Sequence, residues 1–380
     1  MRKQQMMTQP PHAGALRRGK MYFVAPVLVA TGLIAASLQL PGEDHLNLFQ
    51  QGIDASNKGD YDTALSDYDH ALQVDPKNAQ GYILRGFAYE AKGNGEKALA
   101  DFSHAIELDS KFALAYMSRG DLYYARSDFD HAIADYSQAL TLGVNNRLAY
   151  YKRALAYLGK GNDDNAFADL DQAIQIDPNY DDAYFNRAAI FYRRGDYPQA
   201  IADYTQVMRI RPIFAEAYNN RGFIYDQTGQ YDKAISDYSA AILVNPKFAL
   251  AYSNRGTANQ LKGDYANAIS DLNRAVLLNP KDATAYNNLA WLMATCPVAS
   301  FRDGAKAVQA ATLACNLTGW KDPRKIGTLA AACAETGDFA SAVKWQSQFL
   351  EQSHLSGGAE TDAKERLVLY QAHQPFHGNH

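Results

Sequence analysis

The chain has 380 residues, of which 47% are hydrophobic, so it carries ample apolar material for a folded core. Its formal net charge is -4 and its pI is about 6.1, with 41 acidic against 37 basic residues. Nucleic-acid-binding chains carry clustered basic residues, so this composition argues against nucleic acid as a partner.

The first forty residues combine a basic region with an apolar segment. Residues 1–20 contain five lysines and arginines, and residues 21–40 are apolar except for Thr31, Ser37 and Gln39. A helix of twenty residues spans roughly 30 Å, about the thickness of a membrane's hydrocarbon core. Basic residues stay on the cytoplasmic side, so we expect a hydrophobic N-terminal helix that anchors the chain in the inner membrane as a single span, with the rest facing the periplasm.

A cleaved signal peptide is the alternative interpretation of the same segment. Residues 35–37 form a small-residue stretch that suits a processing site, and cleavage there would give a secreted or periplasmic protein. The long basic lead favours an anchor, whereas Pro26 and Gly32 weaken the segment as a rigid span. Both interpretations place the residues after Pro41 outside the cytoplasm.

From residue 45 onward the sequence repeats itself every 34 residues. A small residue recurs at one phase, starting at Gly52, and alanine recurs at another phase, from Ala64 to Ala268. Tyrosine recurs at the fourth position of consecutive units, from Tyr82 to Tyr286. Proline closes four of the units, at Pro178, Pro212, Pro246 and Pro280.

This combination of period, small residues, aromatics and proline resembles the tetratricopeptide repeat, whose unit is a pair of antiparallel helices. The resemblance implies an all-α solenoid in which the helix pairs stack into a right-handed superhelix. We expect seven standard repeats over residues 45–282 and two divergent repeats over residues 283–353, where the pattern loosens. A capping helix and a disordered tail are expected over residues 354–380.

Six of the seven standard repeats pair an arginine at position 7, from Arg85 to Arg255, with an aspartate at position 23. Position 7 lies on the first helix of the repeat, helix A, and position 23 lies at a similar height on the antiparallel second helix, helix B. The eighth repeat has Leu289 and Ala310 at these positions, so both charges are lost together. Removing one partner of a buried ion pair costs about 3 to 5 kcal/mol, which favours joint loss and a structural role.

In this family helix A lines the concave groove, and the resemblance implies that a ligand contacts positions such as 5, 6 and 9. In the N-terminal half these positions are largely apolar, and we expect Phe87, Tyr151 and Phe185 to contact the ligand. In the C-terminal half position 6 is asparagine in four successive repeats, with further asparagines beside it: Asn186, Asn220, Asn254 and Asn288, and then Asn219 and Asn287.

A row of asparagine amides offers donors and acceptors that can hold an extended peptide by its backbone. The row resembles the asparagine ladder in the repeat domain of the N-acetylglucosaminyltransferase that modifies nuclear and cytosolic proteins. The alternative is that asparagine is merely tolerated here as an exposed helical residue.

The sequence contains no phosphate-binding glycine loop, no G-x-S-x-G, no H-E-x-x-H and no C-x-x-C motif, so we expect no catalytic residues, metal or cofactor. It predicts a non-enzymatic scaffold that holds a peptide or protein subunit in its groove, in assembly of the cell envelope or of a complex. Two alternatives stay open. One is a soluble exported adaptor or chaperone, and the other is an accessory subunit that presents substrate to a separate enzyme.

Overall fold

The computed structural model describes residues 43–143, 147–353 and 355–378, and these residues contain α-helices, one short 3-10 helix and no strand. The predicted all-α class is confirmed. The apolar segment at residues 21–40 lies outside the described residues, and no described helix is long and apolar enough to cross a membrane.

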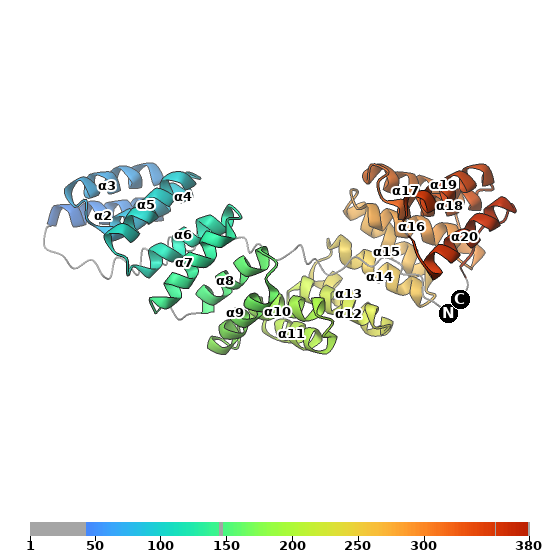
Figure 1. Ribbon diagram of the computed structural model, residues 1–380, viewed down its shortest axis with the longest axis horizontal. Coiled ribbons are helices and arrows are strands. Elements are labelled where there is room, and N and C mark those ends of the chain that lie inside the picture. The colour runs from blue at the N-terminus through green and yellow to red at the C-terminus, as the bar shows by residue number, and fades with distance from the viewer. Residues whose placement is uncertain (1–42, 144–146, 354, 379–380) are drawn as a thin grey trace. The chain divides into compact units, whose positions relative to one another are not determined.

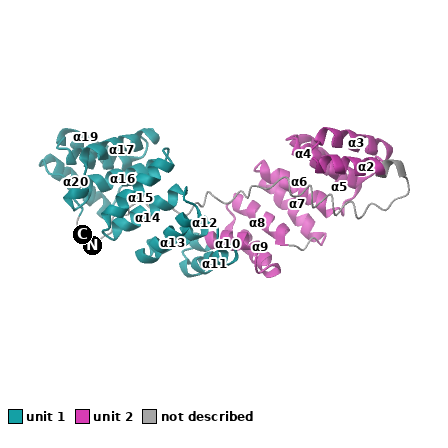
Figure 2. Cartoon of the chain, turned by 180° about the vertical axis from the view of Figure 1, so that it is seen from behind, with its two compact units in different colours: residues 1–13, 191–380 teal, residues 14–190 magenta. Residues whose placement is uncertain are grey.

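The helices form two compact units, and the division falls after residue 190, inside one helix (Figure 2). In the N-terminal unit, magenta in Figure 2, the helices are α2 (Glu43–Asn57), α3 (Tyr61–Val74), α4 (Ala79–Ala91), α5 (Gly95–Leu108), α6 (Ala113–Ala125), α7 (Phe129–Thr141), α8 (Arg147–Gly159), α9 (Asp163–Ile176) and the start of α10 (Asp181–Arg193).

The C-terminal unit, teal in Figure 2, continues from the end of α10. Its elements are α11 (Tyr197–Ile210), α12 (Ala215–Gln227), α13 (Tyr231–Val244), α14 (Ala249–Leu261), α15 (Tyr265–Leu278), α16 (Ala283–Thr295), the 3-10 helix η1 (Ala299–Phe301), α17 (Gly304–Leu317), α18 (Pro323–Glu335), α19 (Phe339–Gln352) and α20 (Gly358–Gln371).

Within each unit, neighbouring helices in the sequence are neighbours in space (Figure 1). From α2 to α9, and again from α11 to α20, each helix packs on the one before it and the one after it. Even-numbered helices from α2 to α18 are therefore helix A of a repeat, and odd-numbered helices are helix B. Both units are stacks of antiparallel helix pairs, as predicted.

The turn between helix A and helix B follows from two adjacent positions of the repeat. Glycine at position 15 adopts the left-handed conformation, as at Gly93 with φ of 77° and Gly161 with φ of 74°. The next residue caps helix B: the Asn94 side chain accepts a hydrogen bond from the backbone N–H of Lys97 at 3.3 Å. Ser127 holds the same left-handed geometry in the third repeat, with φ of 62°.

Small residues at position 8 allow helix A to approach an aromatic ring on helix B. A methyl group added at Gly86 would lie 2.4 Å from a ring carbon of Phe102, and one added at Gly52 would lie 2.5 Å from Tyr68. Both rings are fully buried. The periodic glycines therefore set the distance between the two helices of a repeat.

The predicted ion pairs are present in both units, and each arginine also reaches a second helix. Arg119 donates to both carboxylate oxygens of Asp135, at 2.9 and 2.8 Å, and its other terminal nitrogen donates to Ser103 of the preceding repeat at 3.3 Å. The hydrogen bonds to Asp135 raise the pKa of Arg119, so the pair stays ionised. The same two-carboxylate contact joins Arg85 to Asp101, Arg153 to Asp169, Arg221 to Asp237 and Arg255 to Asp271.

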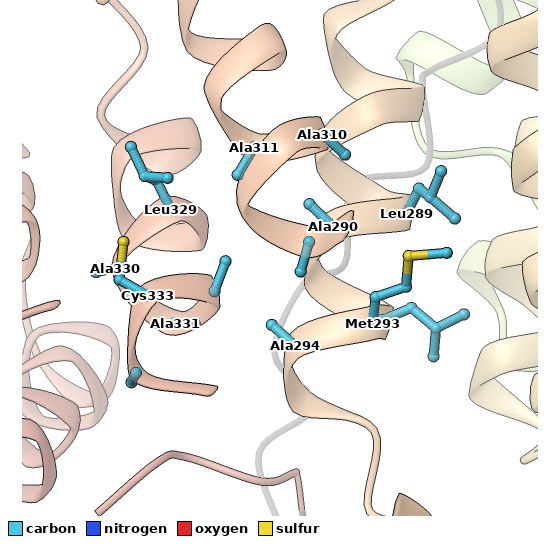
Figure 3. Packing of buried hydrophobic residues seen from close by; sticks show 14 of the residues in the cluster. Leu289, Ala290, Met293, Ala294, Ala310, Ala311, Leu329, Ala330, Ala331 and Cys333 are labelled. Atoms are coloured by element: carbon cyan, nitrogen blue, oxygen red, sulfur yellow. The ribbon is translucent and has the colours of Figure 1, made fainter. Parts of the chain in front are cut away.

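The eighth repeat replaces this ion pair with apolar packing. Leu289 of α16 and Ala310 of α17 are buried in one cluster with Leu329 and Ala330 of α18 (Figure 3). Because both charged partners are missing, no buried charge is left without a counterion. Residues 283–353 thus hold two helix pairs, α16 with α17 and α18 with α19.

The segment after α20 packs against the fold as far as Gly378. His373 turns the chain with φ of 58°, and its ring stacks on Phe339 at 5.2 Å. Further on, the N–H of Gly378 donates to the Thr295 carbonyl at 2.8 Å. Residues 373–378 of the tail thus contact α19 through the ring of His373 and α16 through the backbone of Gly378.

A double-mutant cycle tests the structural role of the ion pair. Arg153→Leu and Asp169→Ala, which copy the residues of the eighth repeat, should each lower the free energy of unfolding by about 3 to 5 kcal/mol, because each leaves a charge without its counterion. The double variant should lose clearly less than the two single losses combined. Urea unfolding followed by circular dichroism measures all four proteins, and strictly additive losses would show that the charges do not act as a pair.

Candidate peptide-binding face

All the residues predicted to contact a ligand lie on A helices, from α4 to α16. We call the surface formed by these residues the A-helix face, and we treat its two parts separately because they belong to different units. In the N-terminal unit this face carries Phe87, Tyr151, Phe185 and Asn186. In the C-terminal unit it carries Asn219, Asn220, Asn254, Asn287 and Asn288.

The aromatic residues of the N-terminal unit are packed within the fold. Phe87 meets Phe102 edge to face at 5.4 Å, and Tyr151 lies 5.0 Å from Tyr180. Phe185 is 6% exposed. Burial raises the pKa of Tyr151 well above its ordinary value, so its hydroxyl stays protonated. These rings are therefore largely buried, and little of their surface is free to contact a ligand.

Two of the predicted residues in this unit contact each other. The Asn186 amide nitrogen donates to the Tyr151 hydroxyl at 3.2 Å and to the Asp182 carbonyl at 2.9 Å. The two residues stand 35 positions apart, one on α8 and one on α10. The amide of Asn186 thus ties consecutive A helices together.

The asparagines of the C-terminal unit also link neighbouring helices. Asn254 on α14 donates to the Asn219 amide oxygen on α12 at 3.2 Å. Asn288 on α16 donates to the Thr257 hydroxyl on α14 at 3.3 Å, and Asn220 donates to the Tyr204 hydroxyl at 3.3 Å. The six predicted asparagines are only 1% to 7% exposed, so the exposed setting that the sequence suggested is not observed.

Asn287 differs from the asparagines beside it. Its amide oxygen is buried, and within the described residues it accepts no hydrogen bond. Buried polar atoms are nearly always paired, and an unpaired one costs about 1 to 3 kcal/mol. Asn287 therefore presents an acceptor that an N–H donor from outside the chain could satisfy.

A charged cluster that the sequence analysis missed lies on the A-helix face of the N-terminal unit. Lys152 on α8 forms an ion pair with Asp121 on α6 at 2.5 Å, and the Tyr136 hydroxyl donates to the same carboxylate at 2.7 Å. Glu90 on α4 lies close enough to Asp121 for the two charges to interact. Glu90, Asp121 and Lys152 occupy positions 12, 9 and 6 of consecutive repeats, so they are 31 residues apart. The 34-residue period therefore does not reveal the cluster.

The position of Glu90 changes its acidity. Burial, and next the negative charge of Asp121, raise its pKa to about 7, while the charge of Lys152 opposes this rise. The carboxyl group therefore changes its charge near neutral pH. The A-helix face of this unit gains a negative charge as the pH rises through 7.

Comparison with protein families identifies the repeats individually. Tetratricopeptide repeat models match residues 215–248, 79–112 and 249–282, and a TPR repeat model matches residues 57–93, 120–161, 156–195 and 188–229. The matches together span more than half of the chain. Three of them begin and end at the repeat boundaries expected from the sequence.

Comparison with solved structures gives the same fold. The C-terminal part of a TPR repeat-containing protein from Cytophaga hutchinsonii is 18% identical, with a TM-score of 0.53, and the match covers 64% of this chain and 98% of that one. PilF of Pseudomonas aeruginosa is 21% identical, with a TM-score of 0.50, and the match covers 58% of this chain and 96% of that one. No curated protein sequence matches the chain.

The raised pKa of Glu90 makes the stability of the protein depend on pH. Between its ordinary pKa of 4.5 and its folded value of about 7, the unfolded chain ionises first, so the folded state loses stability as the pH rises. Glu90→Gln removes this loss. The variant should match the native chain at pH 4 and exceed it by about 1 to 3 kcal/mol at pH 8.

Thermal unfolding at both pH values checks this expectation. Glu351→Gln, at an exposed site on α19, is the matched control and should leave the difference between the two pH values unchanged. If Glu90→Gln gave the same stability change at pH 4 and pH 8, the carboxyl group would not titrate between them.

Proposed function

The chain belongs to the tetratricopeptide repeat family, and on that basis we propose that it is a non-enzymatic scaffold that holds an extended peptide segment of a partner protein on its A-helix face. Repeat proteins of this type use extended surfaces to bind other proteins. An assembly role in the cell envelope is part of the same proposal.

The unpaired amide oxygen of Asn287 supports this proposal most directly. A scaffold that needs this asparagine only for its own fold would pair both ends of the amide, as in Asn219, whose oxygen accepts from Asn254 and whose nitrogen donates to Asn220. An acceptor left open costs stability in the free protein and becomes useful when a donor arrives. A peptide backbone supplies such a donor at every residue except proline.

Other buried polar side chains at groove positions fit the same ligand. Ser253, Thr257 and Gln260 occupy positions 5, 9 and 12 of the repeat of α14, and Asn288 on α16 donates to Thr257. Amides and hydroxyls can exchange partners, because each has both donor and acceptor atoms. A bound backbone would be held through its N–H and C=O groups, so the peptide would be selected for its extended shape more than for its side chains.

The location of the scaffold is a separate part of the proposal. We propose that the repeats face the periplasm, held by a membrane anchor or released after signal cleavage. The support is the sequence alone, with five basic residues before Met21 and the acidic pair Glu43 and Asp44 after the apolar segment.

Substitutions of two asparagines on the A-helix face should affect stability and partner binding differently. Asn254→Ala removes the donor to Asn219 and should lower the free energy of unfolding by about 1 to 3 kcal/mol. Asn287→Ala removes an unpaired acceptor and favours the helix, so the stability should stay constant or rise by up to about 1 kcal/mol. At the same time, Asn287→Ala should weaken partner binding about ten-fold, because one backbone hydrogen bond is lost.

The partner for this test comes from affinity capture with the native chain, and titration of the purified partner then gives the dissociation constants. Asn259→Ala is a control on α14, where the amide donates to Asp271 within the repeat and should not contact the peptide. Equal affinity of the native and Asn287→Ala chains would remove the asparagine row from the binding surface.

A reporter fusion tests the proposed location. An enzyme that is active only in the periplasm, fused after His380, should be active when residues 1–40 are present and inactive when they are deleted, because those residues carry the export signal. N-terminal sequencing of the exported fusion then distinguishes an intact anchor from a cleaved signal. Activity of a reporter that works only in the cytoplasm would contradict the proposed topology.

A further inference from the structure

The tail after α20, residues 372–378, leaves the helix it follows and crosses to other elements. The N–H of His373 donates to the Tyr370 carbonyl at 3.1 Å, and the N–H of Gln374 donates to the Leu369 carbonyl at 2.9 Å, so the helix closes and the chain turns. Beyond this turn the tail contacts α16 and α18, which belong to the two preceding repeats.

An aromatic residue anchors the tail. The ring of Phe376 lies 6.0 Å from the ring of Trp291 on α16. The Arg366 guanidinium of α20 lies 5.7 Å from the centre of each of these rings, so the cation faces both. Trp291 stands at position 9 of its repeat, one of the positions at which the sequence analysis expects ligand contacts.

The next two residues of the tail make polar contacts. His377 hydrogen-bonds through Nε2 to one carboxylate oxygen of Glu335 at 2.7 Å, and Arg302 donates to the other oxygen at 2.8 Å. The N–H of Gly378 donates to the Thr295 carbonyl at 2.8 Å. Thr295 ends α16, where carbonyl groups have no partner within the helix, so the tail supplies a missing donor.

Two of the residues that receive the tail, Thr295 and Arg366, are buried, unlike the tail itself. Arg366 is 9% exposed, and its Nε atom is buried without a hydrogen-bond acceptor. Burial lowers the pKa of Arg366, and the nearby Tyr370 and Asp362 oppose this shift only in part. By contrast, residues 375–378 are only half-buried, and none of them belongs to the core. The tail therefore lies on a site that α16, α18 and α20 form beneath it.

From this geometry we propose that Trp291, Thr295, Glu335 and Arg366 form a second peptide-binding site, which recognises an aromatic residue followed by a histidine and is occupied by the chain's own Phe376 and His377. The site contacts two side chains and one backbone N–H of its peptide. The occupant is held in cis, and a peptide of the same pattern can replace it in trans.

The attachment of the tail to α20 strengthens its hold on the site. A tethered ligand acts at an effective concentration in the millimolar range, so a free peptide must exceed that level to compete. Removal of the tail takes away this competitor. The inference goes beyond the function proposed above and does not rest on it, because the peptide comes from the chain itself.

Binding of the tail in trans tests the inference. The full chain without residues 375–380 should bind a fluorescent peptide of residues 374–380, and the intact chain should bind it at least about ten-fold more weakly, because the tethered tail occupies the site. Fluorescence anisotropy measures both affinities. A peptide with Phe376→Ala should bind the shortened chain at least about ten-fold more weakly, since the aromatic anchor is lost.

One protein variant tests the polar part of the site, and a second serves as the matched control. Glu335→Gln in the shortened chain should weaken binding of the native peptide, because His377 loses its charged acceptor. Asn287→Ala in the shortened chain should leave it unchanged, which separates this site from the asparagine row. A folded, shortened chain that fails to bind the peptide, or that binds the Phe376→Ala peptide equally well, overturns the inference.

Circular dichroism establishes whether the shortened chain keeps its helices. If it does not, the full-length Phe376→Ala, His377→Ala double variant takes its place, because it keeps the backbone contact of Gly378 with Thr295. This variant should bind the native peptide at least about ten-fold more tightly than the intact chain does. Equal affinities of the two proteins would overturn the inference in the same way.

Discussion

The arginine at position 7 holds the stack of repeats together. Arg85, Arg119, Arg153, Arg221 and Arg255 each bind an aspartate on helix B of their own repeat. These five arginines and Arg187 also reach back to position 25 on helix B of the preceding repeat. For Arg255 the second contact is Ser239, at 2.9 Å, and for Arg221 it is Thr205, at 2.9 Å. One side chain therefore fixes the helix pair and its orientation to the previous pair, and the faces that carry the asparagines and aromatics depend on that orientation.

The sequence predicted features that recur with the period of the fold. The left-handed glycines, the small residues opposite aromatic rings and the Arg–Asp pairs each depend on contacts between fixed positions of one repeat, so the 34-residue period reveals them. The burial of Asn254 could not be predicted from the period. Its position on helix A was predicted, but its burial depends on how closely α12 and α14 approach and on Asn219 as its partner.

Contacts that do not share the period could not be predicted in the same way. Glu90, Asp121 and Lys152 form a cluster because each comes from a different position of its repeat, 12, 9 and 6, so 31 residues separate them in place of 34. The tail presents a different difficulty. Its composition of polar residues with one phenylalanine is typical of disorder, and its order depends on Trp291, about 80 residues earlier, and on a carbonyl at the end of α16.

The two-sided contact of each arginine has a consequence for how such arrays change in evolution. The residue at position 25 can be Asp69, Ser103 or Thr205, and all three accept a hydrogen bond from the following repeat. Any repeat with such an acceptor can therefore precede any repeat with the arginine, so duplication or deletion of a whole unit by recombination would preserve every junction. The first repeat has Gln51 and the eighth has Leu289 at position 7, so moving either of them to the interior of the array would leave the junction with its predecessor without this contact. Duplication of a unit therefore preserves the junctions only for the repeats between them.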